Sequence, residues 1–207
     1  MRGSILFVCT ANVCRSPLMQ YTFLSAAPDP GEWSVASAGV AAREGAPMCR
    51  IARALVRSEQ ERCSADAHRS APLDDAGLQT DLVIAASRAE RAALAQRSPE
   101  ARWRVFTLSE AVLLGRYVET LEPCDATQPG TADQYAQLLD AQRGMLVVPR
   151  PQRRRRVLGL GERAHPLDIP DGHRRRRRAH TGALKRVRAE AAELSSQLAS
   201  FRGAPAR

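Results

Sequence analysis

The chain has 207 residues, of which 44% are hydrophobic and 26% are charged, and this globular balance excludes a wholly disordered or collagen-like protein. No apolar run approaches the roughly 18–20 residues of a membrane-spanning helix, and the short apolar run at residues 5–8 is too brief for a secretory signal. The formal net charge of +9 comes entirely from residues 148–207, because residues 1–147 hold 15 Lys and Arg against 17 Asp and Glu.

Short apolar runs and segments with helical periodicity alternate along most of the chain. Strands that alternate with helices predict a parallel sheet covered by helices on both faces. We therefore expect an α/β fold of three layers with a central, mostly parallel, four-stranded sheet. The expected strands cover residues 4–8, 33–38, 81–85 and 104–107, and the expected helices cover residues 17–26, 47–58, 87–97, 108–117, 131–142 and 183–201.

The last expected helix indicates how the chain is organised as a whole. Its apolar residues recur at helical spacing and form a stripe, so we expect the helix to pack on the preceding fold and to complete one domain over residues 1–207. Between the two lies a Pro- and Arg-rich stretch at about residues 144–166, which includes Pro149, Pro151 and four successive arginines. This composition predicts a basic insertion or mobile linker.

A polar segment follows the first expected strand and leads into a helix that begins near Pro17. It contains Cys9 and, six residues later, Arg15 and then Ser16. The same spacing occurs at residues 63–70, but without a strand before it or a proline-started helix after it. A loop between a strand and a helix N-terminus can point successive N–H groups at an oxyanion. An arginine there adds a two-pronged donor, and the positive field favours a thiolate at Cys9.

Residues 8–17, preceded by Ile5-Leu6-Phe7, resemble the phosphate loop of the low-molecular-weight protein tyrosine phosphatases. The resemblance implies that Cys9 is the nucleophile and that Arg15 binds phosphate. It also implies that Cys14 forms a reversible disulfide with Cys9 under oxidation, although simple burial of Cys14 is an equal alternative. The expected substrate-binding residues are Thr10, Ala11, Asn12, Val13, Cys14 and Ser16.

The resemblance extends over about residues 3–118 and resumes near Asp168. In residues 165–173 the Asp-x-x-Asp spacing is similar to the family's acid loop and implies that Asp171 is the general acid, with Asp168 as the second candidate. Gly172 stands where the family has proline, and we expect its backbone freedom to leave the acid less fixed. His173 stands where many members have an aromatic wall, so substrates other than phosphotyrosine remain open.

These observations predict a phosphatase that hydrolyses phosphotyrosine or other aryl phosphate monoesters through a phosphocysteine intermediate. The expected partner is a phosphotyrosine protein or a small aryl phosphate; no cofactor or membrane partner is expected, and the oligomeric state stays open. One alternative is an arsenate reductase that uses the same loop with an external small thiol. Another is a weakly active phosphate- or phosphoprotein-binding module with a basic tail that binds nucleic acid.

The remaining cysteines and histidines indicate no metal site. Five cysteines without a CxxC pair, and no export signal, are typical of reduced thiols in the cytoplasm. We expect the histidines near the C-terminus to be solvated, and the cysteines outside the loop to be packing or incidental thiols. The arginine runs lack interleaved aromatics, so a nucleic-acid partner is disfavoured. The residues concerned are His165, His173 and His180, Cys49, Cys63 and Cys124, and the runs 153–156 and 174–178.

Overall fold

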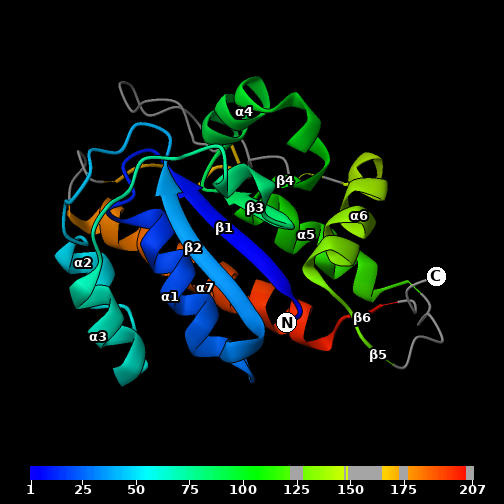
Figure 1. Ribbon diagram of the computed structural model, residues 1–207, viewed down its shortest axis with the longest axis horizontal. Helices are drawn as coiled ribbons and strands as arrows, with labels where there is room; N and C mark the ends of the chain where they lie inside the picture. Colours follow the sequence, from blue (N-terminus) through cyan, green and yellow to red (C-terminus); the bar gives the residue numbers. More distant parts are fainter. Residues whose placement is uncertain (122–127, 147, 149–164, 173–176, 204–207) are drawn as a thin grey trace, which may run out of the picture.

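The structure, a computed structural model, describes residues 1–121, 128–146, 148, 165–172 and 177–203. Its centre is a parallel sheet of four strands in the order β2-β1-β3-β4 (Figure 1). The register pairs Ile5 with Val35 on one side and with Leu82 on the other. The strands are β1 (Gly3–Cys9), β2 (Trp33–Gly39), β3 (Leu82–Ala85) and β4 (Val105–Thr107). The three-layer α/β fold expected from the alternating pattern is confirmed.

Alternate residues of each strand face opposite sides of the sheet and build two hydrophobic cores. On one side, Ile5, Phe7 and Ile84 pack against four helices: α1 (Arg15–Ala26), α5 (Leu108–Glu119), α6 (Ala132–Ala141) and α7 (Arg177–Ser200). On the other side, Leu6 and Val83 pack against α4 (Arg88–Arg97) and neighbouring turns. The two remaining strands, β5 (Gln128–Pro129) and β6 (Arg202–Gly203), form a small antiparallel pair.

The prediction of a single helix over residues 47–58 is wrong. The structure has only the short α2 (Arg50–Arg53) there, followed by α3 (Glu59–Ala67). Pro47 forms an antiparallel bridge with Arg69, and the amide of Cys49 donates to the carbonyl of Val13 at 2.8 Å. These tertiary bonds hold the chain extended up to Cys49, so pairing with distant segments overrides the local helical pattern. The helix α3 gave no signal because the residues it buries, Glu61 and Ala65, form no apolar stripe.

The last helix begins at Arg177, six residues before its predicted start, and its stripe of Leu184, Val187 and Leu194 is fully buried. It packs along α1 and α5 (Figure 1), so the C-terminal segment shares the main core. Most of the insertion expected at about 144–166 lies outside the described residues, and the one-domain organisation stays a prediction. Among the described helices, none is long and apolar enough to cross a membrane.

Candidate active site

The loop predicted to bind phosphate lies at the carboxyl edge of the sheet. Cys9 ends β1 and Arg15 begins α1, so residues 10–14 turn the chain between them. Asn12 has a φ of 52°, the left-handed conformation that asparagine tolerates. A Cβ at Gly39, the last residue of β2, would lie 2.7 Å from the carbonyl oxygen of Thr10. Glycine is therefore required at position 39 for the neighbouring strand to lie against the loop.

The side chain of Asn12 is completely buried and braces the loop. Its Nδ2 donates to Oγ of Ser16 and to Oγ of Ser37, both at 2.9 Å, and its Oδ1 accepts from the amide of Ala71 at 2.9 Å. Every hydrogen-bonding group of the side-chain amide has a partner, which fixes both the side chain and the turn.

Beneath the same loop, Cys9 is 2% exposed, and its Sγ lies 3.1 Å from Oγ of Ser16. Because Asn12 already donates to Ser16, the hydroxyl proton of Ser16 is left for Cys9 or for the carbonyl of Ala38, which is 3.2 Å away. Ser16 can thus donate to a thiolate at Cys9. The loop lines a cavity of about 560 Å³ whose walls are Cys9, Thr10, Ala11, Val13, Cys14, Arg15, Ala41 and Asp171.

Arg15 is held by partners from three segments of the chain. One guanidinium nitrogen donates to the carbonyl of Ile169 at 3.1 Å. The other donates to Oγ1 of Thr10 at 3.1 Å and lies 3.1 Å from the carboxylate of Glu90. Thr10 in turn donates to Glu90 at 2.7 Å. Glu90 therefore compensates the buried charge of Arg15 and fixes its orientation.

Glu90 and Ile169 were absent from the expected site. Glu90 lies in the first turn of α4, directly after β3, and the carboxyl ends of parallel strands share one edge of the sheet. A search for acidic residues just after each predicted strand would have found it. The contact with Ile169 uses the main chain and leaves no trace in the residue type.

The two candidate acids have different surroundings. The Asp171 carboxylate is half-exposed, lines the cavity and lies 3.7 Å from the Arg15 guanidinium. Asp168 instead accepts from the amide of Arg88 at 2.8 Å and from its guanidinium at 3.1 Å, at the start of α4. Burial opposes ionisation of Asp168, but the hydrogen bonds from Arg88 outweigh it and lower the pKa of this carboxyl. The geometry thus favours Asp171 over Asp168 as a proton donor in the cavity.

Gly172 is buried against the first turn of α7, and its effect on how firmly the acid is held stays a prediction. A Cβ at this position would lie 2.5 Å from Cα of His180. The glycine therefore permits a close approach between the loop that carries Asp171 and the helix. The neighbouring contact of Arg15 with Ile169 ties the same loop to the cavity.

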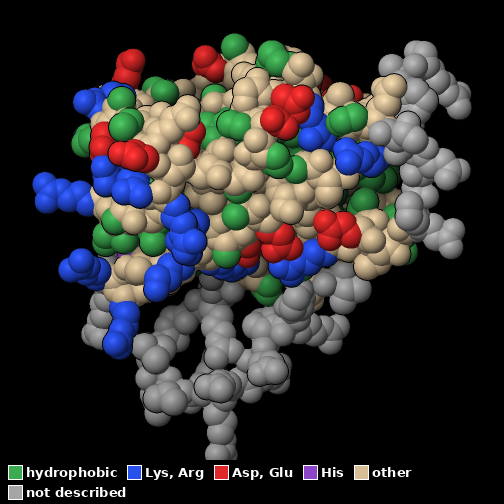
Figure 2. Space-filling view, turned by 90° about the horizontal axis from the view of Figure 1, so that it is seen from below, with side chains coloured by type: hydrophobic (Ala, Val, Ile, Leu, Met, Phe, Trp, Pro, Cys, Tyr) green, Lys and Arg blue, Asp and Glu red, His purple; other side chains and the backbone are tan. Residues whose placement is uncertain are grey.

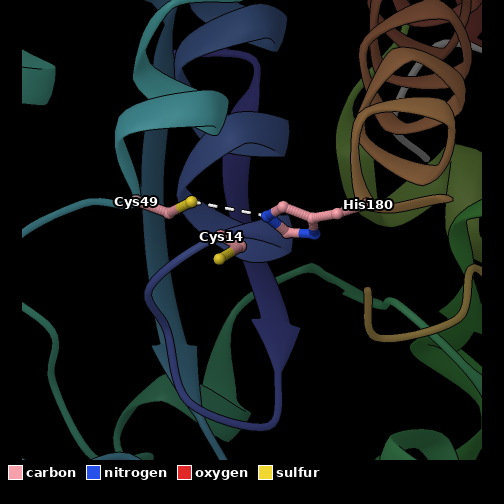
Figure 3. A group of neighbouring side chains, drawn as sticks. All are labelled: Cys14, Cys49 and His180. Carbon is pink, nitrogen blue, oxygen red and sulfur yellow. Dashed lines mark hydrogen bonds between the residues drawn. The ribbon is translucent and has the colours of Figure 1, made fainter. Parts of the chain in front are cut away.

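His180 is 4% exposed, so the expectation of a solvated histidine is wrong at this position. Its Nε2 lies 3.4 Å from Sγ of Cys49, and Cys14 lies beside both (Figure 3). The hydrogen bond from the Cys14 thiol is the main reason that the pKa of Cys49 falls to about 4, and the same bond raises the pKa of Cys14. No disulfide joins Cys9 and Cys14 in the structure, and that pairing stays a prediction.

The remaining cysteines, histidines and arginine runs lie away from the cavity or outside the described residues. Cys63 is exposed, whereas His165 is half-exposed and its Nδ1 accepts from the amide of Leu167. Cys124, His173, the run 153–156 and residues 174–176 lie outside the described part of the chain. On the face drawn in Figure 2, Lys and Arg side chains are most frequent toward one end, and Asp and Glu side chains are interspersed with them.

His68 is a further buried member of the site that the sequence analysis did not select. Its Nε2 lies 2.9 Å from the carbonyl oxygen of Asn12, and its Nδ1 lies 3.3 Å from the hydroxyl of Tyr21. Since a carbonyl only accepts, Nε2 carries the proton and Nδ1 accepts from Tyr21. Burial lowers the pKa of His68 and thus favours the neutral ring. His68 thus stabilises the left-handed turn through its hydrogen bond to the carbonyl of Asn12.

A parallel sheet with a cysteine and an arginine on one strand-to-helix loop at its carboxyl edge is consistent with the class of cysteine-based phosphatases. The comparison with protein families agrees with this class. The model of the family "Low molecular weight phosphotyrosine protein phosphatase" matches residues 4–146. The chain belongs to this family and is a phosphatase of the cysteine-based type. The match also continues past residue 118, where the resemblance was expected to pause.

Individual relatives carry a more specific name. The chain is 35% identical over 138 residues to the protein-arginine-phosphatase of Bacillus subtilis (strain 168), covering 66% of this chain and 87% of the relative. It is 37% identical over 109 residues to that of Geobacillus stearothermophilus, covering 52% and 70%. Among solved structures, a YwlE mutant from Bacillus subtilis matches with 32% identity, coverage of 69% and 92%, and a TM-score of 0.47. A low molecular weight protein tyrosine phosphatase from T. tengcongensis matches with 30% identity, coverage of 68% and 95%, and a TM-score of 0.47.

Proposed function

We propose that this chain is a protein phosphatase that removes the phosphoryl group of phosphoarginine through a phosphocysteine intermediate. The observation that carries the phosphatase half is the placement of Cys9, Arg15 and Asp171 on one cavity, with Ser16 at 3.1 Å from the sulfur. The names of two relatives support the arginine half. The lining residues support it too, since none of those the structure describes is aromatic.

In the first step the Cys9 thiolate attacks phosphorus, a P–S bond forms and the P–N bond to the guanidine breaks. Arg15 and the loop N–H groups bind the phosphoryl oxygens, whose charge they stabilise in the transition state. Asp171 donates its proton to the departing nitrogen, so the guanidine leaves without a negative charge. The half-exposed position of Asp171 at the cavity wall suits a group that must reach the leaving atom.

In the second step Asp171, now ionised, accepts a proton from water, and the water oxygen attacks phosphorus. The P–S bond breaks, inorganic phosphate is released and the Cys9 thiolate is regenerated, with the proton back on Asp171. The hydrogen bond from Ser16 stabilises the departing thiolate in this step. Arg15 supplies the positive charge throughout, with its own orientation set by Glu90 and Ile169.

Phosphotyrosine is the second candidate substrate, because the family's description names it. The same two steps apply, with a P–O bond to a phenol in place of the P–N bond. An aryl group gains affinity from ring contacts, and none of the described residues that line the cavity is aromatic. Arsenate reduction and phosphoprotein binding without turnover are outcomes that the following experiment also distinguishes.

The test compares kcat/KM for a protein bearing phosphoarginine, a phosphotyrosine peptide and p-nitrophenyl phosphate, under reducing conditions. We expect the phosphoarginine protein to give the highest value. Cys9→Ser should lose at least about 10³-fold on every substrate, while Cys63→Ser, at an exposed cysteine on α3, should match the parent chain.

Turnover by Cys9→Ser near the parent rate contradicts the nucleophile. A higher kcat/KM for the phosphotyrosine peptide than for the phosphoarginine protein contradicts the proposed substrate but not the phosphatase activity. Thiol-dependent consumption of arsenate without phosphate release from any substrate favours the reductase. Phosphate binding without turnover favours the binding module.

A further inference from the structure

Three side chains capable of binding a metal meet behind the phosphate loop (Figure 3). Cys14 comes from the end of that loop, Cys49 from the segment before α2, and His180 from α7. One ligand atom from each of the three lies within 4.8 Å of the other two. Within the described ranges, no other group of three His, Cys, Asp or Glu side chains brings its ligand atoms this close together.

The separations fit one tetrahedral ion. With Zn–S of about 2.3 Å and Zn–N of about 2.0 Å, tetrahedral geometry places a sulfur and a nitrogen ligand about 3.5 Å apart and two sulfurs about 3.8 Å apart. Sγ of Cys49 and Nε2 of His180 are 3.4 Å apart, and the Cys14 sulfur lies within 4.8 Å of both. The separations from Cys14 therefore exceed the tetrahedral values by no more than about 1.3 Å.

The main chain around these side chains is already fixed. Cys49 donates its amide to Val13, the residue before Cys14, at 2.8 Å. The helix that carries His180 packs directly on Gly172. Cys14 and His180 are 7% and 4% exposed, and Cys49 is half-buried. A preformed and mostly buried set of ligands reduces the ordering cost of binding.

We propose that Cys14, Cys49 and His180 form a binding site for a divalent metal ion of the zinc type. Two thiolates and an imidazole are the ligands that zinc prefers, and three protein ligands leave the fourth position for water or an anion. Cys14 also lines the cavity of Cys9, so the ion would lie at the wall of the phosphatase site. Phosphoryl transfer as described above does not use this ion.

Occupancy of the site has two consequences. It cross-links the phosphate loop to α7, so it stabilises the folded chain by an amount that grows with metal concentration. It also uses the Cys14 sulfur as a ligand, so an occupied site opposes a disulfide between Cys14 and Cys9. Both effects are independent of which phosphorylated residue the enzyme hydrolyses.

The test is a titration of the reduced full-length chain with Co²⁺, whose thiolate charge-transfer bands and intense visible bands report tetrahedral sulfur ligation. We expect one ion per chain, displaced by Zn²⁺. Cys49→Ser and His180→Gln should each weaken binding by more than about 100-fold, beyond the roughly 10–100-fold loss of a group that only supports a ligand. Cys63→Ser is the matched control and should bind as the parent does.

Two further variants separate loss of a ligand from loss of structure. His180→Cys should retain binding, with stronger charge-transfer bands from a third thiolate. Cys9→Ser should retain it as well. Zn²⁺ should raise the unfolding temperature of the parent chain and of Cys63→Ser, but not that of Cys49→Ser. The proposal is overturned if Cys49→Ser and His180→Gln bind Co²⁺ with the affinity of the parent chain. It is also overturned if Cys9→Ser loses Co²⁺ binding while Cys49→Ser and His180→Gln keep it.

Discussion

The carboxylate of Glu90 lies 3.1 Å from the guanidinium of Arg15, and only 4% and 6% of the two side chains are exposed. Glu90→Gln removes the charge that compensates Arg15 and leaves a buried cation without its main partner. We expect the free energy of unfolding in phosphate-free buffer to fall by about 3 kcal/mol. Because a bound anion then replaces the lost charge, phosphate should raise the unfolding temperature more in the variant than in the parent chain.

A matched control exists on α5. Glu110 is also a buried carboxylate paired with an arginine, Arg91, at 2.6 Å, and it does not line the cavity of Cys9. Glu110→Gln should destabilise the chain while leaving its response to phosphate unchanged. An equal phosphate response in the two variants would show that Glu90 acts only in stability.

Asn12 combines a left-handed backbone with a fully hydrogen-bonded side chain. Asn12→Gly removes the hydrogen bonds but accepts the φ of 52°, whereas Asn12→Ala removes the bonds and also carries a Cβ penalty of about 1 kcal/mol. Both variants should lose kcat/KM by more than about tenfold, since the loop loses its brace. Urea denaturation should find the alanine variant about 1 kcal/mol less stable than the glycine variant. An alanine variant as stable as the glycine variant would contradict a penalty for a Cβ in the left-handed conformation at position 12.

The buried His68 predicts a dependence of stability on pH. Burial lowers its pKa in the folded chain below the ordinary value of about 6.5. As pH falls below about 6.5, the unfolded chain takes up a proton that the folded chain does not, so stability decreases until the folded pKa is passed. Above about pH 7 this contribution is constant.

His68→Gln removes that titration while keeping a donor near the carbonyl of Asn12. The slope of unfolding free energy against pH, measured by urea denaturation from about pH 7 to 5, should be shallower in the variant. The largest possible difference is about 1.4 kcal/mol per pH unit, for one proton. Identical slopes in the two proteins would contradict a lowered pKa at His68.

The two aspartates of residues 165–172 predict opposite phenotypes. Asp171→Asn should lower kcat by about 10²–10⁴-fold for substrates with poor leaving groups, the range of general acid catalysis, and much less for p-nitrophenyl phosphate. Asp168→Asn breaks its contacts with Arg88 at the start of α4, so it should lower the unfolding temperature and leave kcat within about threefold of the parent. The reverse pattern of kcat values would assign the acid to Asp168.

The sequence predicted the sheet well because each strand is an apolar run that ends in a polar turn, and the four strands are within two residues of their expected bounds. It predicted Cys9 and Arg15 from the spacing within residues 8–17, and Asp171 from the separate Asp-x-x-Asp spacing in residues 165–173, because each spacing carries the resemblance. It did not predict Glu90, His68 or Cys49 beside the loop. Those positions depend on how α4, α3 and the segment before α2 fold back on the sheet, which local patterns do not encode.

Gly172 illustrates the same limit and yields a final prediction. In the sequence, a glycine in place of proline implies a looser acid. In the structure, the same glycine packs closely on His180 of α7. Gly172→Ala places a Cβ at 2.5 Å from Cα of His180, a backbone atom that cannot turn aside. We expect a loss of about 1–3 kcal/mol in stability and a lower kcat, because the loop moves away from Arg15.

The control is Gly182→Ala on α7, where a Cβ would meet nothing within 4 Å. There alanine should stabilise the helix by about 1 kcal/mol and leave kcat unchanged. Thermal unfolding and the kcat for the phosphoarginine protein, measured on both variants, separate helix propensity from the close contact. If Gly172→Ala were as stable and as active as Gly182→Ala, the loop would tolerate a side chain there, and the contact with His180 would not be what positions Asp171.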